Sequence, residues 1–483
     1  MRLRATRIGA ACAACTAALA LASCKVGPNY HRPDAAVPSA YKELPPGWKV
    51  GAPHDAGDRG EWWGIFNDPE LDGLERQVNI SNQNVKQYEA QYREALALLK
   101  QAQAQLFPTL GVSFGAQRGG GGGGTAAVAS AVGSGAGGST HTEFTLEGVL
   151  SWQPDLWGTI RRQVESRKAG VQVSEADLAN AQLSAQATLA TDYFDLRAAD
   201  SLRELLAKSR SLDEKTLEIT RHQMESGTAT SGDLAAAQAA LEAVQAQLVA
   251  VDQQRGTYEH AIAVLVGRLP SDLSIPTAPL AAAMLQVPVA VPSELLERNP
   301  SIAAAERQMQ QENALIGVAI GAYFPTISLS GLGGYSGDPL SSLIRMNNRI
   351  WSTGATASDT LFQGGAQVAA VAGARATYDQ YVANYRQTVL SAFQQVEDNL
   401  LALRVLGQEV DFQQQAVKHA QIAADVALNQ FNAGTVSYTT VITDIQTLLA
   451  DQESLLTIQQ NQLVADVTLI EALGGGWEVA RLK

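Results

Sequence analysis

Histidine, cysteine and acidic side chains are the groups in this chain that could do chemistry, but their spacing matches no familiar reaction. The six histidines have no partner at metal-ligand spacing; they are His31, His54, His141, His222, His260 and His419. No Gly-x-Ser-x-Gly elbow or Walker loop is present. The neighbouring acids Glu175 and Asp177 would point to different faces of a helix. The sequence therefore predicts a protein that is not an enzyme and needs no metal or cofactor.

The glycine-rich run 119–124 could be mistaken for a phosphate-binding loop. Such a loop needs spaced glycines followed by Lys and Ser or Thr at the start of a helix. This run has neither feature and joins two predicted strands, so we expect a mobile surface loop.

All three cysteines fall within the first 24 residues. Cys12 and Cys15 form a Cys-x-x-Cys pair, but a basic start followed by an apolar stretch indicates that residues 1–23 are a cleaved signal peptide. The Leu-Ala-Ser-Cys sequence that ends at Cys24 resembles the lipobox of bacterial lipoproteins. This resemblance implies a covalent lipid on Cys24, and Lys25 in the next position implies sorting to the outer membrane.

Charge and hydropathy exclude two further classes of protein. The net charge of −13 gives no electrostatic support for binding nucleic acid. No apolar run of about 20 residues follows residue 24, so we expect no membrane-spanning helix in the mature chain. Transmembrane β-strands stay compatible with the sequence, because their alternating pattern is weaker per segment.

Two proline-free runs, 163–222 and 366–430, predict two very long helices. About 60 residues at roughly 1.5 Å each would extend on the order of 90 Å. Apolar residues in the second run recur mostly every three or four positions, which is the seam of a helix that packs along another helix. They are Val371, Tyr378, Val382, Tyr385, Val389, Phe393, Val396, Leu400 and Leu403. The first run carries a seam in steps of seven, followed by further apolar positions: Val164, Val171, Leu178 and Ala185, then Leu189, Tyr193 and Leu196.

The chain also looks like a tandem duplication of one unit. Phe107-Pro108-Thr109-Leu110 recurs 217 residues later as Phe324-Pro325-Thr326-Ile327, and Val266-Gly267 recurs 207 residues later as Leu473-Gly474. Unequal loops in the middle of each copy would absorb the difference. We therefore predict a division into an arm and equatorial segment, a first repeat, a linker, a second repeat and a tail: 24–68, 69–268, 269–292, 293–474 and 475–483.

Four segments of about ten residues alternate apolar with polar or small residues, as half-exposed strands do. They predict two hairpins, 109–157 and 326–362, whose strands have the length of tilted transmembrane strands. The last strand is predicted over 350–362, where Asp359 falls among the apolar positions. The apolar positions are Leu110, Val112, Phe114, Ala116, Phe144, Leu146, Leu150, Trp152, Ile327, Leu329, Tyr335, Trp351, Ala355, Ala357 and Leu361.

Shorter helices flank each hairpin and long helix. Asp68-Pro69 predicts the start of a helix over 69–106, with Trp62 and Trp63 as a packing anchor just before it. A returning helix follows each long one and ends in glycine, at Gly267 and at 474–476. The two shorter helices of a repeat together match the long one, so we expect them to lie end to end beside it.

One copy cannot complete this architecture. Four strands do not close a barrel, and an open sheet edge in lipid leaves unpaired backbone groups that cost several kcal/mol each. Three copies supply 12 strands and enough helices to enclose a channel. The predicted fold is mainly α with a β-barrel portion: a tandem-duplicated unit with a long α-helical barrel and four transmembrane strands per chain, closing a 12-stranded β-barrel as a trimer.

These features together resemble the outer-membrane factor family, the TolC-like channels, in its lipoprotein branch that works with RND-type efflux pumps. The motifs that carry the resemblance run over nearly the whole mature chain. They are Cys24 with Val26-Gly27-Pro28-Asn29-Tyr30 and Pro33, Trp62-Trp63 with Phe66, Asp68-Pro69 and Leu71, the two Phe-Pro-Thr strand starts, Pro154-Asp155-Leu156-Trp157-Gly158, Leu361-Phe362 with Gly364-Gly365, and the Gly-Thr turns at Gly227 and Gly434.

The resemblance implies a homotrimer in the outer membrane of a Gram-negative bacterium, anchored by lipid, with a periplasmic helical tunnel. Its partners would be a periplasmic adaptor (membrane fusion) protein and an inner-membrane RND-type transporter, with outer-membrane lipid around the pore. Two sets of tip residues would contact the adaptor: Ser226, Gly227 and Thr228, and Ala433, Gly434 and Thr435.

The family's periplasmic entrance carries acidic residues, and the resemblance assigns this role to Asp233. The equivalent position in the second repeat is Thr440, so Asp444 would substitute there. Three-fold symmetry would turn each aspartate into a ring that attracts cations. The alternative for Asp233 is an ordinary helix N-cap, and for Asp444 a solvated helix face.

Three functions compete. The first is a passive exit duct for small toxic compounds or drugs in a tripartite efflux pump. The second is the same duct in a type I protein secretion system, and the third is a periplasmic coiled-coil scaffold without a pore. The scaffold would not explain the four strand segments. Five methionines and no spare cysteine favour organic compounds over soft metals as cargo.

Overall fold

The computed structural model describes residues 25–34, 37–44, 61–120, 140–281 and 292–475. The chain is mainly helical with one small sheet, and it divides into two compact units. The sheet unit takes Met1–Arg32, Glu94–Val171 and Gln308–Val382, and the helical unit takes Pro33–Arg93, Gln172–Arg307 and Ala383–Lys483. The predicted signal peptide, Cys24 and most of the glycine-rich run lie outside the described residues.

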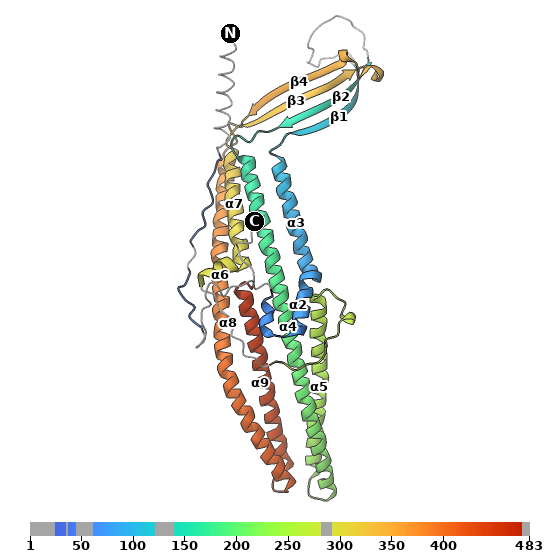
Figure 1. Ribbon diagram of the computed structural model, residues 1–483, viewed down its shortest axis with the longest axis vertical. Helices are drawn as coiled ribbons and strands as arrows, with labels where there is room; N and C mark the ends of the chain where they lie inside the picture. Colours follow the sequence, from blue (N-terminus) through green and yellow to red (C-terminus); the bar gives the residue numbers. More distant parts are fainter. Residues whose placement is uncertain (1–24, 35–36, 45–60, 121–139, 282–291, 476–483) are drawn as a thin grey trace. The chain divides into compact units, whose positions relative to one another are not determined.

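The sheet contains four antiparallel strands in the order β1-β2-β3-β4 (Figure 1). Their bounds are Thr109–Gly120 for β1, Thr140–Trp152 for β2, Thr326–Gly337 for β3 and Arg349–Ser358 for β4. The hairpins β1–β2 and β3–β4 are joined by the pairing of β2 with β3, for example Leu150 opposite Gly331. Gly119 and Gly120 are the last residues of β1 rather than part of a loop.

The register places the predicted apolar positions of all four strands on one face of the sheet. Leu110 lies opposite Leu150, and Phe114 lies opposite Leu146, which in turn faces Tyr335. The other face carries mainly Ser, Thr, Gly and Glu, including a hydrogen bond from Ser113 to Glu147 of 3.2 Å. Several apolar side chains are 60–78 % exposed in the single chain: Leu110, Val112, Phe114 and Trp351.

The last strand is shorter than the sequence pattern predicted. β4 ends at Ser358 instead of continuing to residue 362. Asp359 and Leu361 therefore lie beyond the strand, and the charge on its apolar face is that of Arg349, its first residue, opposite Tyr335. Ser358 pairs with Thr326, the first residue of β3, so β4 has no partner strand beyond it. Gly364 and Gly365, with positive φ angles of 59° and 89°, then turn the chain towards the next helix.

Aromatic stacking and a helix cap fix the chain where β2 leads into the first long helix. Trp157 stacks on Phe324 with ring centroids 4.9 Å apart, and its indole N–H donates to the carbonyl of Pro325 at 2.8 Å. Asp155 accepts the backbone N–H groups of Ile160 and Arg161 at 3.1 and 2.8 Å. These contacts give a physical role to the Pro-Asp-Leu-Trp-Gly and Phe-Pro-Thr motifs.

The predicted N-terminal arm is extended and anchored within the sheet unit. Arg162 is fully buried and donates to the carbonyls of Val26 and Gly27 at 2.8 and 2.9 Å. Gly27 has φ of +90°, and a Cβ there would lie 2.5 Å from Cα of Gly317. A larger residue at either glycine would push the arm off the helix.

The duplication extends to the lengths of the elements. Helices α4, Thr159–Glu225, and α8, Ala366–Asn432, each contain 67 residues. Helices α5, Ser231–Leu265, and α9, Tyr438–Ala472, each contain 35 residues. All four bounds recur at the 207-residue shift read from the sequence, and most of the predicted seam residues of α8 are buried. In the helical unit α5 lies along α4 and α9 along α8 (Figure 1).

The helix predicted over 69–106 is wrong in one respect, because it is two helices. Helix α2, Pro69–Ser81, ends at Asn82, and α3, Gln83–Ala104, begins after it. The side-chain oxygen of Asn82 accepts the N–H groups of Asn84 and Val85 at 2.9 and 3.1 Å, so it caps α3. The side-chain amide donates to the carbonyl of Leu265 at 2.8 Å, which joins the start of α3 to the end of α5.

The second repeat has the same junction. Asn299 separates α6, Pro292–Arg298, from α7, Pro300–Gly321, and donates to the carbonyl of Ala472 at 3.1 Å. A glycine completes each junction. A Cβ on Gly267 would lie 2.4 Å from the carbonyl oxygen of Ser81, and one on Gly474 would lie 2.0 Å from that of Arg298. The expected end-to-end arrangement of the two shorter helices is confirmed at these contacts.

The aromatic anchor before α2 is confirmed. Trp62–Phe66 forms a 3₁₀ turn, η1, in which Trp62 and Trp63 are buried. The Trp62 indole donates to Gln186 on α4 at 3.1 Å. Asp68 caps α2 by accepting the N–H groups of Glu70 and Leu71, with Pro69 in the first helical position.

One helix is long and apolar enough to cross a membrane by length and composition, and the sequence prediction that no helix spans the membrane stays a prediction. It is α5, and only 17 % of its most apolar 18-residue window is buried in the single chain. Repeated alanines rather than large apolar residues raise its hydropathy, which is why no long apolar run was evident. The apolar side of α5 is therefore largely exposed in the single chain, and a surface from outside this chain would have to cover it.

Candidate functional site at the helix tips

The turn between α4 and α5 is closed by Gly227 and Thr228. Gly227 has φ of +78°, which favours glycine, and its N–H donates to the carbonyl of Met224 at 3.0 Å. The N–H and the hydroxyl of Thr228 both donate to the carbonyl of Gln223, at 2.8 and 3.0 Å. Ser226 adds its own hydroxyl to the same carbonyl at 2.9 Å. The Gly-Thr pair is therefore a helix-ending motif.

The turn between α8 and α9 repeats this geometry. Gly434 has φ of +74°, and Thr435 donates both its N–H and its hydroxyl to the carbonyl of Gln430 at 2.9 Å. Ala433 replaces serine and keeps only the backbone bond to Asn429 at 3.1 Å. All six predicted tip residues are exposed, so each turn presents a small surface whose backbone is closed by hydrogen bonds.

Asp233 lies at the third position of α5, where it forms a reciprocal cap with Thr230. The Thr230 hydroxyl accepts the N–H of Asp233 at 3.1 Å, and Asp233 Oδ2 accepts the N–H of Thr230 at 2.9 Å. The N-cap residue of α5 is therefore Thr230. Asp233, whose alternative role from the sequence was an N-cap, is its partner in the capping box. These hydrogen bonds, first the backbone one and then that from the Thr230 hydroxyl, lower the pKa of Asp233 and keep it ionised. The entrance role of Asp233 stays a prediction.

Thr440 takes the same helical position in α9, and its hydroxyl lies 3.4 Å from that of Ser437, the N-cap residue. No side-chain cap hydrogen bond forms at this helix start, and Thr440 carries no charge. Asp444 follows one turn further along α9 and is partly exposed. Its carboxylate makes no hydrogen bond or ion pair with the described residues. Its proposed service in place of Thr440 stays a prediction.

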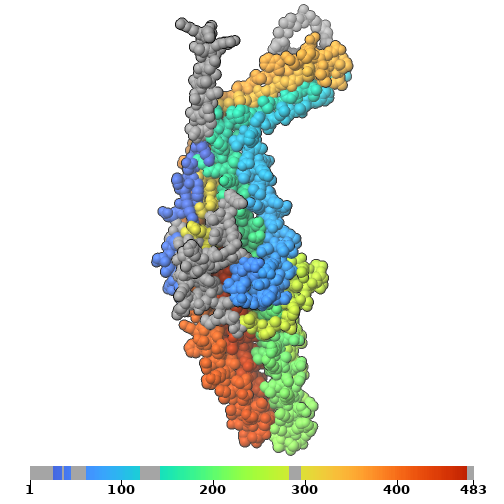
Figure 2. All heavy atoms as spheres, viewed as in Figure 1, coloured from blue at the N-terminus to red at the C-terminus, as the bar shows by residue number. Residues whose placement is uncertain are grey.

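A cluster of buried apolar residues holds the two turns together, and we call it the tip cluster. Its members come from α5, α8 and α9: Ala237, Ala424, Ala427, Phe431, Tyr438, Val441, Ile445 and Leu448. The rings of Phe431 and Tyr438 lie 5.6 Å apart across the second turn. Leu212 and Leu217 of α4 pack against the cluster. In the space-filling view the α8–α9 pair, orange and red, lies against the green α5 (Figure 2).

A buried carboxylate beside the tip cluster was missed by the sequence analysis. Asp213 of α4 is 5 % exposed, and burial raises its pKa to about 6. Burial and the charge of Asp213 together raise the pKa of Tyr438 to about 12. The seven-residue seam that begins at Val164 would have found this aspartate, because its further steps reach Ala199, Leu206, Asp213 and Thr220, all of them buried.

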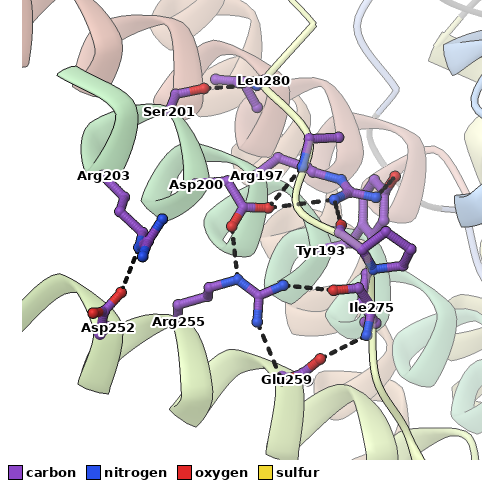
Figure 3. A network of polar contacts seen from close by, with 12 residues as sticks. Tyr193, Arg197, Asp200, Ser201, Arg203, Asp252, Arg255, Glu259, Ile275 and Leu280 are labelled. Atoms are coloured by element: carbon purple, nitrogen blue, oxygen red, sulfur yellow. Dashed lines mark hydrogen bonds and ion pairs between the residues drawn. The ribbon is translucent and has the colours of Figure 1, made fainter. Parts of the chain in front are cut away.

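A second polar site in the helical unit was also missed, and we call it the strap site (Figure 3). Asp200 on α4 accepts the Arg255 guanidinium at 2.7 Å and lies 3.4 Å from Arg197. Arg197 also donates to the hydroxyl of Tyr193 at 2.9 Å, and its guanidinium carbon lies 4.7 Å from the centre of that ring. Asp200 is 7 % exposed, and both arginines are paired.

These side chains bind the backbone of the linker strap, residues 273–280. Arg197 donates to the carbonyl of Pro276 and Arg255 to that of Ile275, both at 2.6 Å. Glu259 accepts the N–H of Ile275 at 2.6 Å. The linker has no secondary structure here, so side chains of α4 and α5 satisfy its backbone.

The second repeat binds a different segment with the equivalent arginine. Arg404, which is 207 residues after Arg197, pairs with Glu43 at 2.5 Å. Glu397 accepts the backbone N–H groups of Lys42 and Glu43 at 2.9 and 3.0 Å. Tyr41 packs against Phe393 with ring centroids 6.4 Å apart. The N-terminal arm therefore does for α8 what the linker does for α4.

The arrangement as a whole suits binding and packing. Within the described residues, no three His, Cys, Asp or Glu side chains are grouped closely enough to hold a metal ion. The buried charges at the strap site are paired with one another and with backbone groups. At the helix tips, two exposed turns lie next to the tip cluster, and Asp233 adds a negative charge.

Comparison with known proteins gives a consistent result. A family model described as outer membrane efflux protein matches residues 74–268 and 291–475. The chain is 27 % identical to the toluene efflux pump outer membrane protein TtgC of Pseudomonas putida, over 95 % of this chain and 94 % of that protein.

Solved structures share the fold. The outer-membrane channel OprN matches with a TM-score of 0.83 at 27 % identity, covering 94 % of this chain and 100 % of that one. The outer membrane channel CmeC of Campylobacter jejuni matches with a TM-score of 0.87 at 23 % identity, covering 95 % of this chain and 96 % of that one.

Proposed function

The chain belongs to the outer membrane efflux protein family, and we propose that it is the outer-membrane channel of a tripartite efflux pump. It is a passive exit duct for small toxic compounds, which pass from a periplasmic adaptor and an inner-membrane transporter to the outside. The names of relatives favour efflux over protein secretion, since one of them belongs to a toluene efflux pump. A toluene pump also agrees with organic rather than metal cargo.

The observation that carries the proposal is the two-faced, open sheet. Its apolar face collects the alternating residues of all four strands and is exposed in the single chain, whereas its other face is polar. The edges β1 and β4 do not pair with each other. Because unpaired edges are costly in lipid, we infer that three copies join edge to edge into a 12-stranded barrel with the apolar face towards lipid.

The exposed apolar side of α5 supports the same assembly. Val249 and Val264 are 72 % and 64 % exposed in the single chain. We infer that this side of α5 packs against a neighbouring copy in the helical ring rather than against lipid. Alanine-rich faces allow helices to approach closely, which suits a closed ring of helices.

Partners follow from the tips and the N-terminus. The turns that contain Gly227 and Gly434 are exposed and closed by hydrogen bonds, so we propose that they contact the periplasmic adaptor, which connects them to an RND-type transporter. A lipid on Cys24 would anchor the arm in the outer membrane. Mass spectrometry of the mature N-terminus tests this anchor, and an unmodified Cys24 in mature protein would refute it.

Conductance of the purified trimer in a planar bilayer tests the duct. We expect single channels, and a stable trimer without conductance, even with altered entrance residues, would favour the scaffold. At the entrance, Asp233→Ala or Asp444→Ala should change conductance or cation preference, while Glu175→Ala should not. Thr230→Ala removes the cap of α5 but keeps the Asp233 charge. If it changes cation preference as much as Asp233→Ala does, the acidic entrance is wrong.

Efflux in cells separates the first two functions. A strain that lacks the chain should accumulate an organic toxicant such as toluene and recover export when the chain is restored. Recovery of protein secretion without any change in toxicant tolerance would instead support the secretion duct.

A further inference from the structure

Two adjoining hollows lie in the helical unit between α4, α5 and α9. The first has a volume of about 210 Å³ and the second about 300 Å³. Gln247 and Glu453 line both of them, so the hollows meet at these two residues. We call the pair the double hollow. None of its lining residues belongs to the exposed turns or to the linker strap.

The walls of the double hollow are mixed, with apolar residues and several glutamines, and its charges are all negative. The apolar walls of the first hollow include Val244, Ile445 and Leu449, and those of the second include Leu202, Leu206 and Val251. Three carboxylates line the space: Asp213 in the first hollow, Asp195 in the second and Glu453 in both. Among the described residues that line it, none is Lys, Arg or His.

Asp213 is the residue that points to a ligand. It is 5 % exposed, and its carboxylate makes no hydrogen bond or ion pair with the described residues. A buried carboxylate without a partner is costly unless a cation or a proton neutralises it. Nearby lysine and arginine side chains are engaged elsewhere, as in the pairs of Lys208 with Glu204 and Arg210 with Glu214.

An inorganic cation does not fit these walls. Hard cations such as Mg²⁺ and Ca²⁺ need several oxygen ligands around one point. The described residues form no group of three acidic or histidine ligands, and more than half of the residues that line each hollow are alanine, valine, leucine or isoleucine. A ligand with one positive nitrogen and an extended apolar body matches both the charges and the walls.

We propose that the double hollow binds an amphiphilic organic cation, with its positive nitrogen beside Asp213 and Glu453 and its apolar body along α5 and α9. This binding site goes beyond the proposed duct function, because a single chain would bind the ligand reversibly whether or not a pore conducts. Its carboxylates supply the charge recognition, and its volume limits the ligand to a small, elongated molecule.

Binding of ethidium to the purified full chain in non-ionic detergent tests the site, with fluorescence anisotropy as the readout. We expect saturable binding of one ethidium per chain. Asp213→Asn and Glu453→Gln should each weaken it about ten-fold, the loss expected for a charge-assisted contact. Ala243→Leu, which fills the first hollow without altering charge, should also weaken it. Glu242→Gln is the matched control, because Glu242 is an exposed acid on α5 outside both hollows.

A neutral apolar dye, N-phenyl-1-naphthylamine, separates charge recognition from general hydrophobic binding. Asp213→Asn should leave its binding unchanged. The proposal is overturned if ethidium does not saturate, if Glu242→Gln weakens it as much as Asp213→Asn, or if the two dyes lose affinity alike. Thermal unfolding of each variant verifies its fold. Because no step depends on conductance, failure here would leave the duct proposal intact, and a chain without conductance could still bind ethidium.

Discussion

Glu75 should make the protein less stable as pH rises, and Glu75→Gln should remove that effect. Glu75 lies on α2 in the helical unit and is 0 % exposed. Neither of its carboxyl oxygens has a hydrogen-bond partner among the described residues. Burial, together with the charge of Asp72, raises its pKa from 4.5 to about 9. The native state therefore holds a proton on Glu75 at neutral pH, and the unfolded chain does not.

The sign and size follow from proton linkage. Between the two pKa values the native state binds more protons than the unfolded state, so stability is full below about pH 4.5 and falls as pH rises towards 9. At about 1.4 kcal/mol per pH unit, the loss between pH 5 and pH 8 is about 4 kcal/mol. Glutamine does not ionise, so Glu75→Gln should lose this part of the pH dependence.

Urea unfolding at pH 5 and pH 8, followed by the helical circular dichroism signal, measures the effect. Comparing wild type with Glu75→Gln at both pH values cancels any cost of the amide that does not depend on pH. Glu70→Gln is the control, because Glu70 is exposed on the same helix. Equal pH dependence in wild type and Glu75→Gln would show that Glu75 is ionised when folded, and the reasoning from its burial would fail.

Three further substitutions can be measured by the same unfolding experiment. Asn82→Ala removes a helix cap and the bond to α5, and should cost about 1–2 kcal/mol; a neutral result would mean that the junction is held by packing alone. Gly267→Ala should cost more than Gly227→Ala. Both glycines have positive φ, but a Cβ on Gly267 would lie 2.4 Å from the carbonyl oxygen of Ser81, whereas a Cβ on Gly227 would meet nothing within 4 Å. Equal costs would refute the close contact. Arg197→Met should cost about 1–3 kcal/mol by removing the donor to the buried Pro276 carbonyl and the weaker of the two arginine partners of Asp200. Arg203→Met should cost no more than about 1 kcal/mol because its pair with Asp252 is exposed; similar costs would contradict the buried network.

The long elements could be predicted because their signals are local and repeated. The seam of α8, from Val371 to Leu403, needs only helical periodicity, and the strand faces need only alternation. The turns at Gly227 and Gly434 follow from the requirement for positive φ. Duplication helped as well, since each boundary in the first repeat supports one in the second. Each of these features can be recognised from the local sequence, without knowing which distant segments contact it.

What the sequence did not reveal depends on contacts between distant segments. Asn82 interrupts no apolar period, and its role as a cap becomes evident only beside the end of α5. Glu75 and Asp213 are charged residues that ordinary patterning assigns to solvent, although a strict seven-residue count places Asp213 on the buried seam. The strap site needs the linker to return to Arg197 and Arg255. The end of β4 at Ser358 depends on its pairing with Thr326, where β3 begins.

The two halves are latched by chain segments at very different distances along the sequence. Arg197 reaches Pro276 across 79 residues, whereas Arg404 reaches Glu43 across 361. The second segment lies between two further anchors of the N-terminal arm, Gly27 on Arg162 and Trp62 on Gln186. Two repeats with helices of equal length are therefore fastened by parts of the chain that have no counterpart in each other.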